Sequence, residues 1–309
     1  MMINIRNELC ITSCWTLDGW SHGVSGHIFE IVDYYYILKN KFDTCILLCD
    51  PLMTSEWFRK VITEKYDFNE DEIDGILRAT IFHKAPKYVK CNKILFVDGC
   101  LVRMQQSGIR IFYNTAYTFK CSKYETVHDL RAYANVQPLL DYRVYTKVNK
   151  LDTHIGINYV KKLLLGRYKS IESNITNNAL IYATKNCRVL SNKQLNKIIQ
   201  TYNFNSYIVV TDVPGEYEGF NDNIIISHPP VKSLFEKFNT YIYTPTLGKW
   251  DGSPRLPVEC KHYKKDVIYY DIDDQYLEHD RGLYFRIQDI QSNYENLHLK
   301  QTDDIINII

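Results

Sequence analysis

The chain has 309 residues, of which 45% are hydrophobic and 24% are charged. This composition is typical of a folded globular protein and excludes a collagen-like, coiled-coil or wholly disordered chain. The length exceeds that of a usual single core and favours two domains. The 37 basic and 36 acidic residues give a formal net charge of +1, so the total charge alone indicates neither a nucleic-acid nor a membrane partner.

The longest apolar runs, such as residues 45–49, are far shorter than the roughly 20 residues of a membrane-spanning helix. The N-terminus reaches an acidic residue at position 8 and lacks the apolar core of a secretory signal. We therefore expect no membrane partner and a cytoplasmic location. The nine cysteines are an odd number that indicates free thiols rather than a disulfide framework. Their spacing and that of the histidines predict no metal site.

The first half of the chain alternates short apolar runs with an amphipathic segment, which is typical of an α/β domain with a parallel sheet. A helix is predicted over 25–39, where Ile28, Ile31 and Leu38 recur at helical spacing. The expected strands are 9–15, 44–49, 79–83, 93–97 and 109–113.

The second half repeats this alternation. The expected strands are 179–183, 207–210, 223–226, 240–243 and 266–270. The expected helices are 192–202, 231–238, 254–262 and a last one from about 284. A polar stretch near 140–160 predicts a linker. We therefore expect a first domain over 1–150, a second over 151–284 and a C-terminal helix over 285–309. In doubly wound domains the ligand binds where the strands end.

The most informative motif follows the expected strand 240–243. It contains Asp251, Gly252 and Ser253, then Arg255 at the start of a helix that carries Glu259. Backbone amides at a helix N-terminus favour an anion such as a diphosphate, and an arginine in the first turn can bind phosphate oxygens through two donors. The alternative is a simple turn and N-cap, with Glu259 on a solvated face.

This order of strand, acidic residue, glycine, small residue and glutamate-bearing helix resembles the donor site of GT-B glycosyltransferases. The resemblance implies two Rossmann-like domains facing each other across a cleft, with the C-terminal helix crossing back to the first domain. It implies that Glu259 binds the ribose hydroxyls, that Arg255 and the amides of Gly252 and Ser253 bind the diphosphate, and that Asp251 approaches the sugar.

Three further segments match the same family. Lys185 and Arg188 follow the expected strand 179–183, where the family binds the diphosphate, although a lone cation after a strand is usually solvated. His228 lies in a segment that resembles the family's nucleobase-reading loop, and two prolines there equally fit a plain helix start. The glycine-rich loop 18–27 includes His22 and Gly23. The family places such a loop beside the transferred sugar and the diphosphate, although its glycine spacing is a weak signal.

The expected strand 93–97 is followed by Asp98 and Arg103. This stretch resembles that of the T-even phage DNA β-glucosyltransferases, in which the matching aspartate is the general base. The resemblance implies that Asp98 is catalytic and that Arg103 and His22 lie on the acceptor side. The alternative is an aspartate that only forms a turn. A base at Asp98 implies inversion, whereas the Asp251-x7-Glu259 spacing is commoner among retaining enzymes, so the stereochemistry is left open.

Charge is distributed unevenly along the chain. Residues 84–169 hold sixteen basic and five acidic side chains, which favours a polyanionic acceptor; scattered solvated faces are the alternative. The predicted function is transfer of a sugar from a UDP-sugar to the hydroxymethyl group of a modified cytosine in double-stranded phage DNA, in the host cytoplasm and without a required cofactor. The alternatives are a glycan acceptor, such as a lipopolysaccharide, or a non-catalytic DNA- or nucleotide-binding protein of the same fold.

Overall fold

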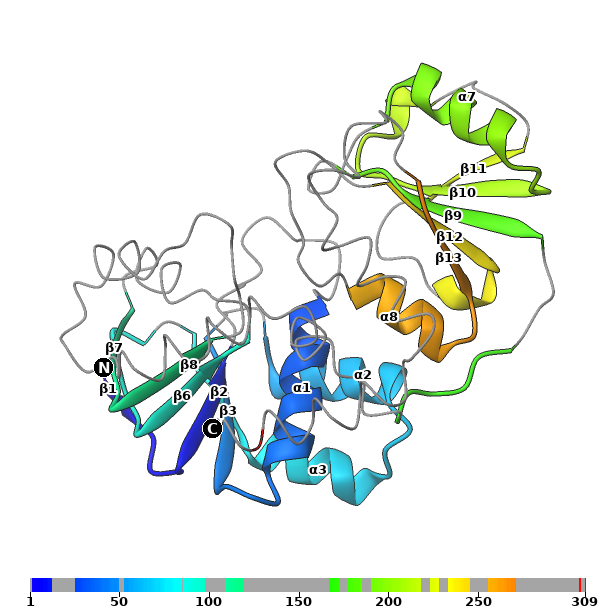
Figure 1. The fold of residues 1–309 in the computed structure, drawn as a ribbon. Helices are drawn as coiled ribbons and strands as arrows, with labels where there is room; N and C mark the ends of the chain where they lie inside the picture. Colours follow the sequence, from blue (N-terminus) through cyan, green and yellow to red (C-terminus); the bar gives the residue numbers. More distant parts are fainter. Residues whose placement is uncertain are drawn as a thin grey trace. The chain divides into compact units, whose positions relative to one another are not determined.

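The computed structural model divides the chain into two compact units (Figure 1). Unit 1 comprises Met1–Lys169 and Glu295–Ile309, and unit 2 comprises Ser170–Tyr294. The structure describes the following residues: 2–12, 26–49, 53–84, 86–97, 109–118, 167–172, 177–184, 190–217, 223–227, 233–244, 255–270, 306 and 309.

Unit 1 is built on a five-stranded parallel sheet, here called the long sheet, in the order β4-β3-β2-β6-β8. Its strands are β2 (Leu9–Thr12), β3 (Thr44–Leu48), β4 (Thr80–Phe82), β6 (Lys93–Phe96) and β8 (Thr115–Thr118). Counted along the chain within this sheet, the order is 3-2-1-4-5. This is the order of a doubly wound sheet, and it reverses between β2 and β6.

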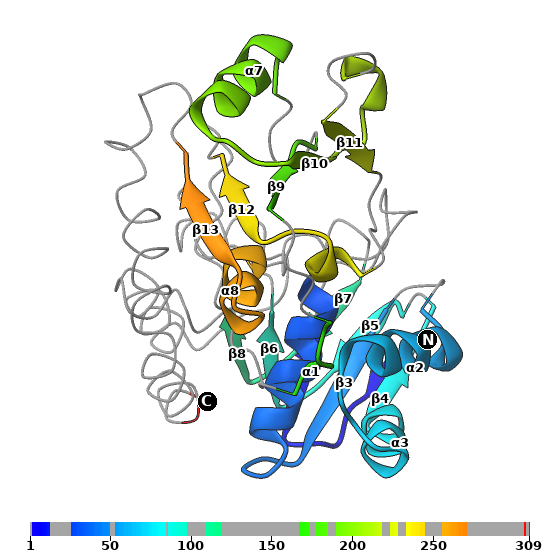
Figure 2. The same cartoon turned by 90° about the vertical axis from the view of Figure 1, so that its right-hand side faces the viewer.

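Three helices lie together on one side of the long sheet (Figures 1 and 2). They are α1 (Gly26–Leu38), α2 (Ser55–Lys65) and α3 (Glu70–Arg78). The side chain of Thr54 caps α2, and Asn69 forms a capping box with Glu72 at the start of α3. Such caps satisfy backbone amides that have no partner within the helix.

The opposite face of the long sheet packs against a second, three-stranded parallel sheet, here called the short sheet. Its strands are β1 (Met2–Asn4), β5 (Tyr88–Lys90) and β7 (Arg110–Phe112), in the order β1-β5-β7. Cys10, Cys45 and Leu47 of the long sheet share one buried cluster with Val89 and Ile111 of the short sheet. A layer of strands therefore covers the face that helices leave open.

The segment Arg167–Lys169 is held to the rest of unit 1 by hydrogen bonds. The amide of Asp67 donates to the carbonyl of Arg167 at 2.7 Å, and the amide of Lys169 donates to the carbonyl of Lys65 at 3.0 Å. The hydroxyls of Tyr168 and Tyr66 donate to the buried carboxylate of Asp33 at 2.9 and 2.7 Å. A buried carboxylate is costly without such donors, so these contacts fix the segment that precedes the unit boundary.

A second set of contacts holds the same segment. Arg167 binds both carboxylate oxygens of Glu72, at 3.1 and 3.0 Å, and the hydroxyl of Tyr36 donates to the same carboxylate. The hydrogen bond from Tyr36 and the guanidinium of Arg167 lower the pKa of Glu72 to about 2. The Arg167 guanidinium also lies over the ring of Phe68, 5.1 Å from its centroid.

Unit 2 contains one five-stranded parallel sheet in the order β11-β10-β9-β12-β13. Its strands are β9 (Asn178–Tyr182), β10 (Ser206–Val210), β11 (Ile224–Ser227), β12 (Thr240–Tyr243) and β13 (Asp266–Tyr269). Counted along the chain, the order is again 3-2-1-4-5, and it reverses between β9 and β12.

Helices cover both faces of this sheet. Helix α7 (Asn192–Thr201) lies on one side, and α8 (Arg255–His262) lies on the other (Figure 1). Ala179 and Ile181 of β9 pack with the α7 side, whereas Leu180 packs with Cys260 on the α8 side. This alternation is what a parallel strand buried on both faces requires.

The predicted α/β class with parallel sheets is confirmed, and the main strands match within one or two residues where the structure describes them. The predicted helix 231–238 is wrong over its described residues, 233–238. Ser233 adopts a left-handed conformation with φ 49°, and of these residues only Leu234–Glu236 are helical, in a short 3-10 helix. A left-handed residue interrupts the right-handed helical backbone. Helices α2 and α3 and strands β1, β5 and β8 were not predicted.

The predicted boundary at residue 150 and most of the predicted C-terminal helix lie outside the described residues. Of that helix the structure describes Ile306, which is helical, and Ile309, whose carbonyl accepts a hydrogen bond from Lys93 Nζ at 3.3 Å.

Candidate functional site

In unit 2 the sheet order brings together two strands whose following segments carry predicted donor residues. Strand β9 pairs directly with β12, and the order reverses between them. Lys185 and Arg188 follow β9 in the chain, and Asp251 follows β12. At such a reversal the connections leave toward opposite faces of the sheet and leave a crevice where ligands bind.

Helix α8 carries the predicted residue whose side chain the structure describes. Arg255 begins the helix, and Glu259 lies one turn further on and is only 7% exposed. Glu259 is therefore not on a solvated face. Burial, with the Glu259 carboxylate as a second cause, raises the pKa of the neighbouring Cys260 thiol well above its ordinary value. A buried carboxylate is costly unless hydrogen-bond donors compensate it.

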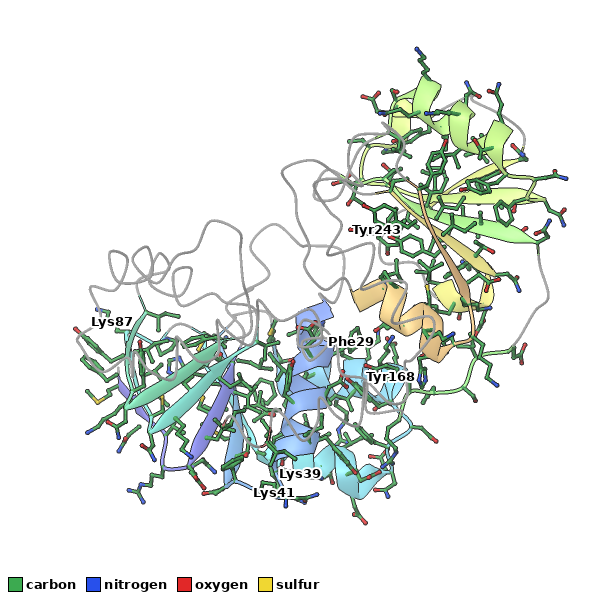
Figure 3. All side chains as sticks on the ribbon, viewed as in Figure 1. Phe29, Lys39, Lys41, Lys87, Tyr168 and Tyr243 are labelled. Carbon is green, nitrogen blue, oxygen red and sulfur yellow. The ribbon has the colours of Figure 1, made fainter. Side chains whose placement is uncertain are left out.

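Three tyrosines form a row at the carboxyl ends of β9, β12 and β13. Tyr243, which Figure 3 labels, is the register partner of Tyr269, with ring centroids 5.8 Å apart. Tyr182 ends the strand on the other side of Tyr243. All three are partly buried and pack on the α8 side, together with Leu256 in the first turn of that helix. The row therefore borders the start of α8.

This tyrosine row was not predicted. The sequence offers one signal for it, because each tyrosine stands within the last two residues of a predicted strand. To predict that the three tyrosines lie side by side, one must know the register between their strands. That register depends on pairing across the sheet.

Unit 1 repeats the arrangement. Strands β2 and β6 are paired neighbours, and the sheet order reverses between them. The loop with His22 and Gly23 follows β2 and leads into α1, whereas Asp98 and Arg103 follow β6. The two predicted groups of unit 1 thus also follow the strands that flank a reversal.

The side chains of most predicted site residues lie outside the described part of the chain. These are His22, Gly23, Asp98, Arg103, Lys185, Arg188, His228, Asp251, Gly252 and Ser253. Arg255 is described as the first residue of α8. His228 directly follows β11, which ends at Ser227.

Neither a protein-family model nor a curated protein matches this chain.

The described residues contain no group of three or more histidine, cysteine or acidic side chains that could hold a metal ion. Five cysteines are described, all free and buried. Burial raises the pKa of Cys49 and Cys91 to about 12, so these thiols are protonated parts of the core. No described helix is long and apolar enough to cross a membrane.

Proposed function

We propose that the chain is a GT-B glycosyltransferase that moves a sugar from a UDP-sugar to the hydroxymethyl group of a modified cytosine in phage DNA. One observation carries the proposal. In each unit, two groups of predicted site residues follow the two strands that flank the reversal of sheet order, and His228 alone follows another strand, β11. The motifs come from the local sequence and the order comes from strand pairing, so the two are independent.

The donor would bind at unit 2. The amides of Gly252 and Ser253, together with Arg255, would hold the diphosphate, and Lys185 and Arg188 would add positive charge from the neighbouring strand. The burial of Glu259 supports its role as acceptor of the two ribose hydroxyl hydrogens. His228 would lie beside the nucleobase, while Asp251 would approach the sugar ring.

The acceptor would bind at unit 1. Asp98 would take the proton from the hydroxymethyl oxygen as that oxygen attacks the anomeric carbon. The bond from the anomeric carbon to the diphosphate would break, and UDP would leave with its electron pair, stabilised by the cations of the donor site. The target base would be flipped out of the duplex, with His22 and Arg103 on the acceptor side and Gly23 beside the sugar.

Two wider features belong to the same proposal. The basic stretch 84–169 would attract the polyanionic duplex. The grouping of Glu295–Ile309 with unit 1 supports a C-terminal segment that returns to the first domain, as in GT-B enzymes. No metal or other cofactor is required by the proposed chemistry.

Calorimetry with UDP tests the donor site. Glu259→Gln should weaken UDP binding about tenfold to hundredfold, because hydrogen bonds to a charged acceptor contribute about 1.5–3 kcal/mol. The control is Glu216→Gln, which changes an exposed glutamate of the same unit. The loss should be much smaller for 2′-deoxy-UDP, which lacks one of the two hydroxyls. Equal losses for both nucleotides would remove the ribose assignment of Glu259.

A transfer assay tests the acceptor. The protein is incubated with hydroxymethylated or unmodified DNA and a panel of UDP-sugars, and the product nucleosides are identified by mass spectrometry. Transfer only to hydroxymethylated DNA is expected. Transfer to a glycan instead of DNA would overturn the acceptor, and UDP binding without any transfer would favour a non-catalytic protein.

A further inference from the structure

The short sheet of unit 1 has an outer face that carries none of the residues assigned to the donor site or to the general base, although its lysines belong to the basic stretch 84–169. Ile3, Val89 and Ile111 point into the core shared with the long sheet. Because side chains alternate along a strand, the residues next to these three within each strand lie on the opposite face. This outer face comprises Met2, Asn4, Tyr88, Lys90 and Phe112, with Arg110 at the register position next to Tyr88.

Two aromatic rings lie side by side on the outer face. Tyr88 and Phe112 have centroids 6.2 Å apart and ring planes only 26° from parallel. Both side chains are partly exposed, and Met2 on the neighbouring strand is 58% exposed. Nearly parallel, partly exposed rings on a sheet offer flat surfaces on which nucleobases stack without a sequence requirement.

The charge on this face is positive. Lys90 lies on the outer face and Lys87 directly precedes β5, and both are exposed. Strands β1, β5 and β7 contain no acidic residue. Among the described residues, neither lysine forms an ion pair. Two ammonium groups without an ion pair in the described part of the chain, beside two aromatic rings, complement a strand that carries phosphates between its bases.

We propose that the outer face of the short sheet binds a single-stranded segment of nucleic acid. The bases stack on Tyr88 and Phe112, and the phosphates contact Lys87 and Lys90. This binding does not rest on the transfer reaction, because it involves none of the residues assigned to the donor or to the base.

Fluorescence anisotropy with a labelled oligodeoxythymidine of about 12 nucleotides tests the rings. Tyr88→Ala and Phe112→Ala should each weaken binding about tenfold, since one stacked base contributes about 1–3 kcal/mol. Tyr88→Phe should bind as the wild type does, because it keeps the ring. Phe42→Ala, which removes another partly exposed ring of unit 1, is the matched control. Should Tyr88→Ala fold poorly in a thermal melt, Tyr88→Leu keeps apolar bulk without the ring.

The salt dependence tests the lysines. Replacing Lys87 and Lys90 by glutamine should flatten the plot of log affinity against log salt by about 1.4, which corresponds to two lost phosphate contacts on a single strand. Lys41→Gln is the control, and Figure 3 shows Lys41 and Lys87 on different parts of unit 1.

Two outcomes would overturn the proposal. One is an absence of binding by the wild type, and the other is an equal effect of Phe42→Ala and the ring variants. A change in oligomeric state without a change in oligonucleotide binding would instead assign the face to self-association and would also reject the proposal. UDP affinity should be unchanged in all the outer-face variants. A wild type that binds the oligonucleotide but not UDP would reject the proposed function and leave this inference standing.

Discussion

The two five-stranded sheets of this chain share one strand order but are covered differently. In unit 2, α7 and α8 enclose the sheet from both sides. In unit 1, helices cover one face and the short sheet covers the other. In each unit, two groups of predicted residues follow, in the chain, the strands that flank the reversal of this order. Because a sheet instead of helices covers one face in unit 1, this unit has a further exposed sheet face, the outer face of the short sheet. Strand order and covering layer therefore each provide a separate surface for binding.

Both units bury charged side chains. Unit 1 holds Asp33 fully buried between two tyrosine hydroxyls, and unit 2 holds Glu259 and Lys265 at 7% and 6% exposure. A buried carboxylate depends on each of its donors. We therefore expect single polar substitutions to act more strongly in the core of unit 1 than at the helix ends of unit 2.

Under the proposed function, the largest effect is expected at Asp98, which follows β6 in the chain. Asp98→Ala should reduce turnover by about 10²–10⁴-fold, the usual contribution of a general base, while UDP affinity in calorimetry stays near that of the wild type. This result would show that Asp98 in unit 1 contributes to catalysis and that UDP binding depends on other residues, those assigned to unit 2. An active Asp98→Ala enzyme would show that Asp98 is not the base, and reduced UDP affinity would place it in the donor site.

The next largest effect is expected in the segment Arg167–Lys169. Tyr168→Phe removes one of the two phenol donors to Asp33 and should lower the free energy of unfolding by about 1–3 kcal/mol, measured by urea denaturation. Tyr202→Phe is the control in unit 2, because its hydroxyl belongs to a partly exposed tyrosine. Equal destabilisation by the two variants would show that the buried carboxylate gives unit 1 no special sensitivity.

Short apolar runs sufficed to predict most strands, because a parallel strand such as β3 is buried along its whole length and is apolar from Cys45 to Leu48. Strands β1 and β5 have only three residues each, too few to show a period. Helix α3 was not predicted, although Asn69 and Glu72, which form its capping box, are a sequence signal for a helix start.

The candidate site could be predicted only as separate motifs. Glu259 was identified by its spacing from Asp251, but its burial results from packing of α8 on the sheet. The strand order and the alignment of Tyr182, Tyr243 and Tyr269 depend on pairing between distant segments, which local sequence does not specify.

A smaller effect is expected at the helix N-termini, because both units stabilise a helix start with a side-chain cap. Ser191 caps α7 in unit 2, with Gln194 completing a capping box. Ser191→Ala should cost about 1 kcal/mol in urea denaturation, and Thr54→Ala at the start of α2 should cost about the same. Unequal costs would show that the two units do not depend equally on their helix caps.

The smallest effect is a pH dependence confined to unit 1. The pKa of Glu72 is lowered from 4.5 to about 2, so its ionised form favours the folded state. This contribution is fully present above about pH 4.5 and is lost as the pH falls toward 2. Because the pair with Arg167 is partly exposed, we expect only about 0.5–1 kcal/mol.

Glu72→Gln should therefore be less stable than the wild type in urea denaturation at pH 6, and the difference should shrink between pH 4.5 and 2.5. Glu64→Gln is the control, since its exposed pair with Lys60 spans 3.9 Å and contributes little. A difference between wild type and Glu72→Gln that stays constant with pH would mean that the carboxylate acts through packing. The hydrogen bonds from Tyr36 and Arg167 would then contribute to stability without depending on its charge.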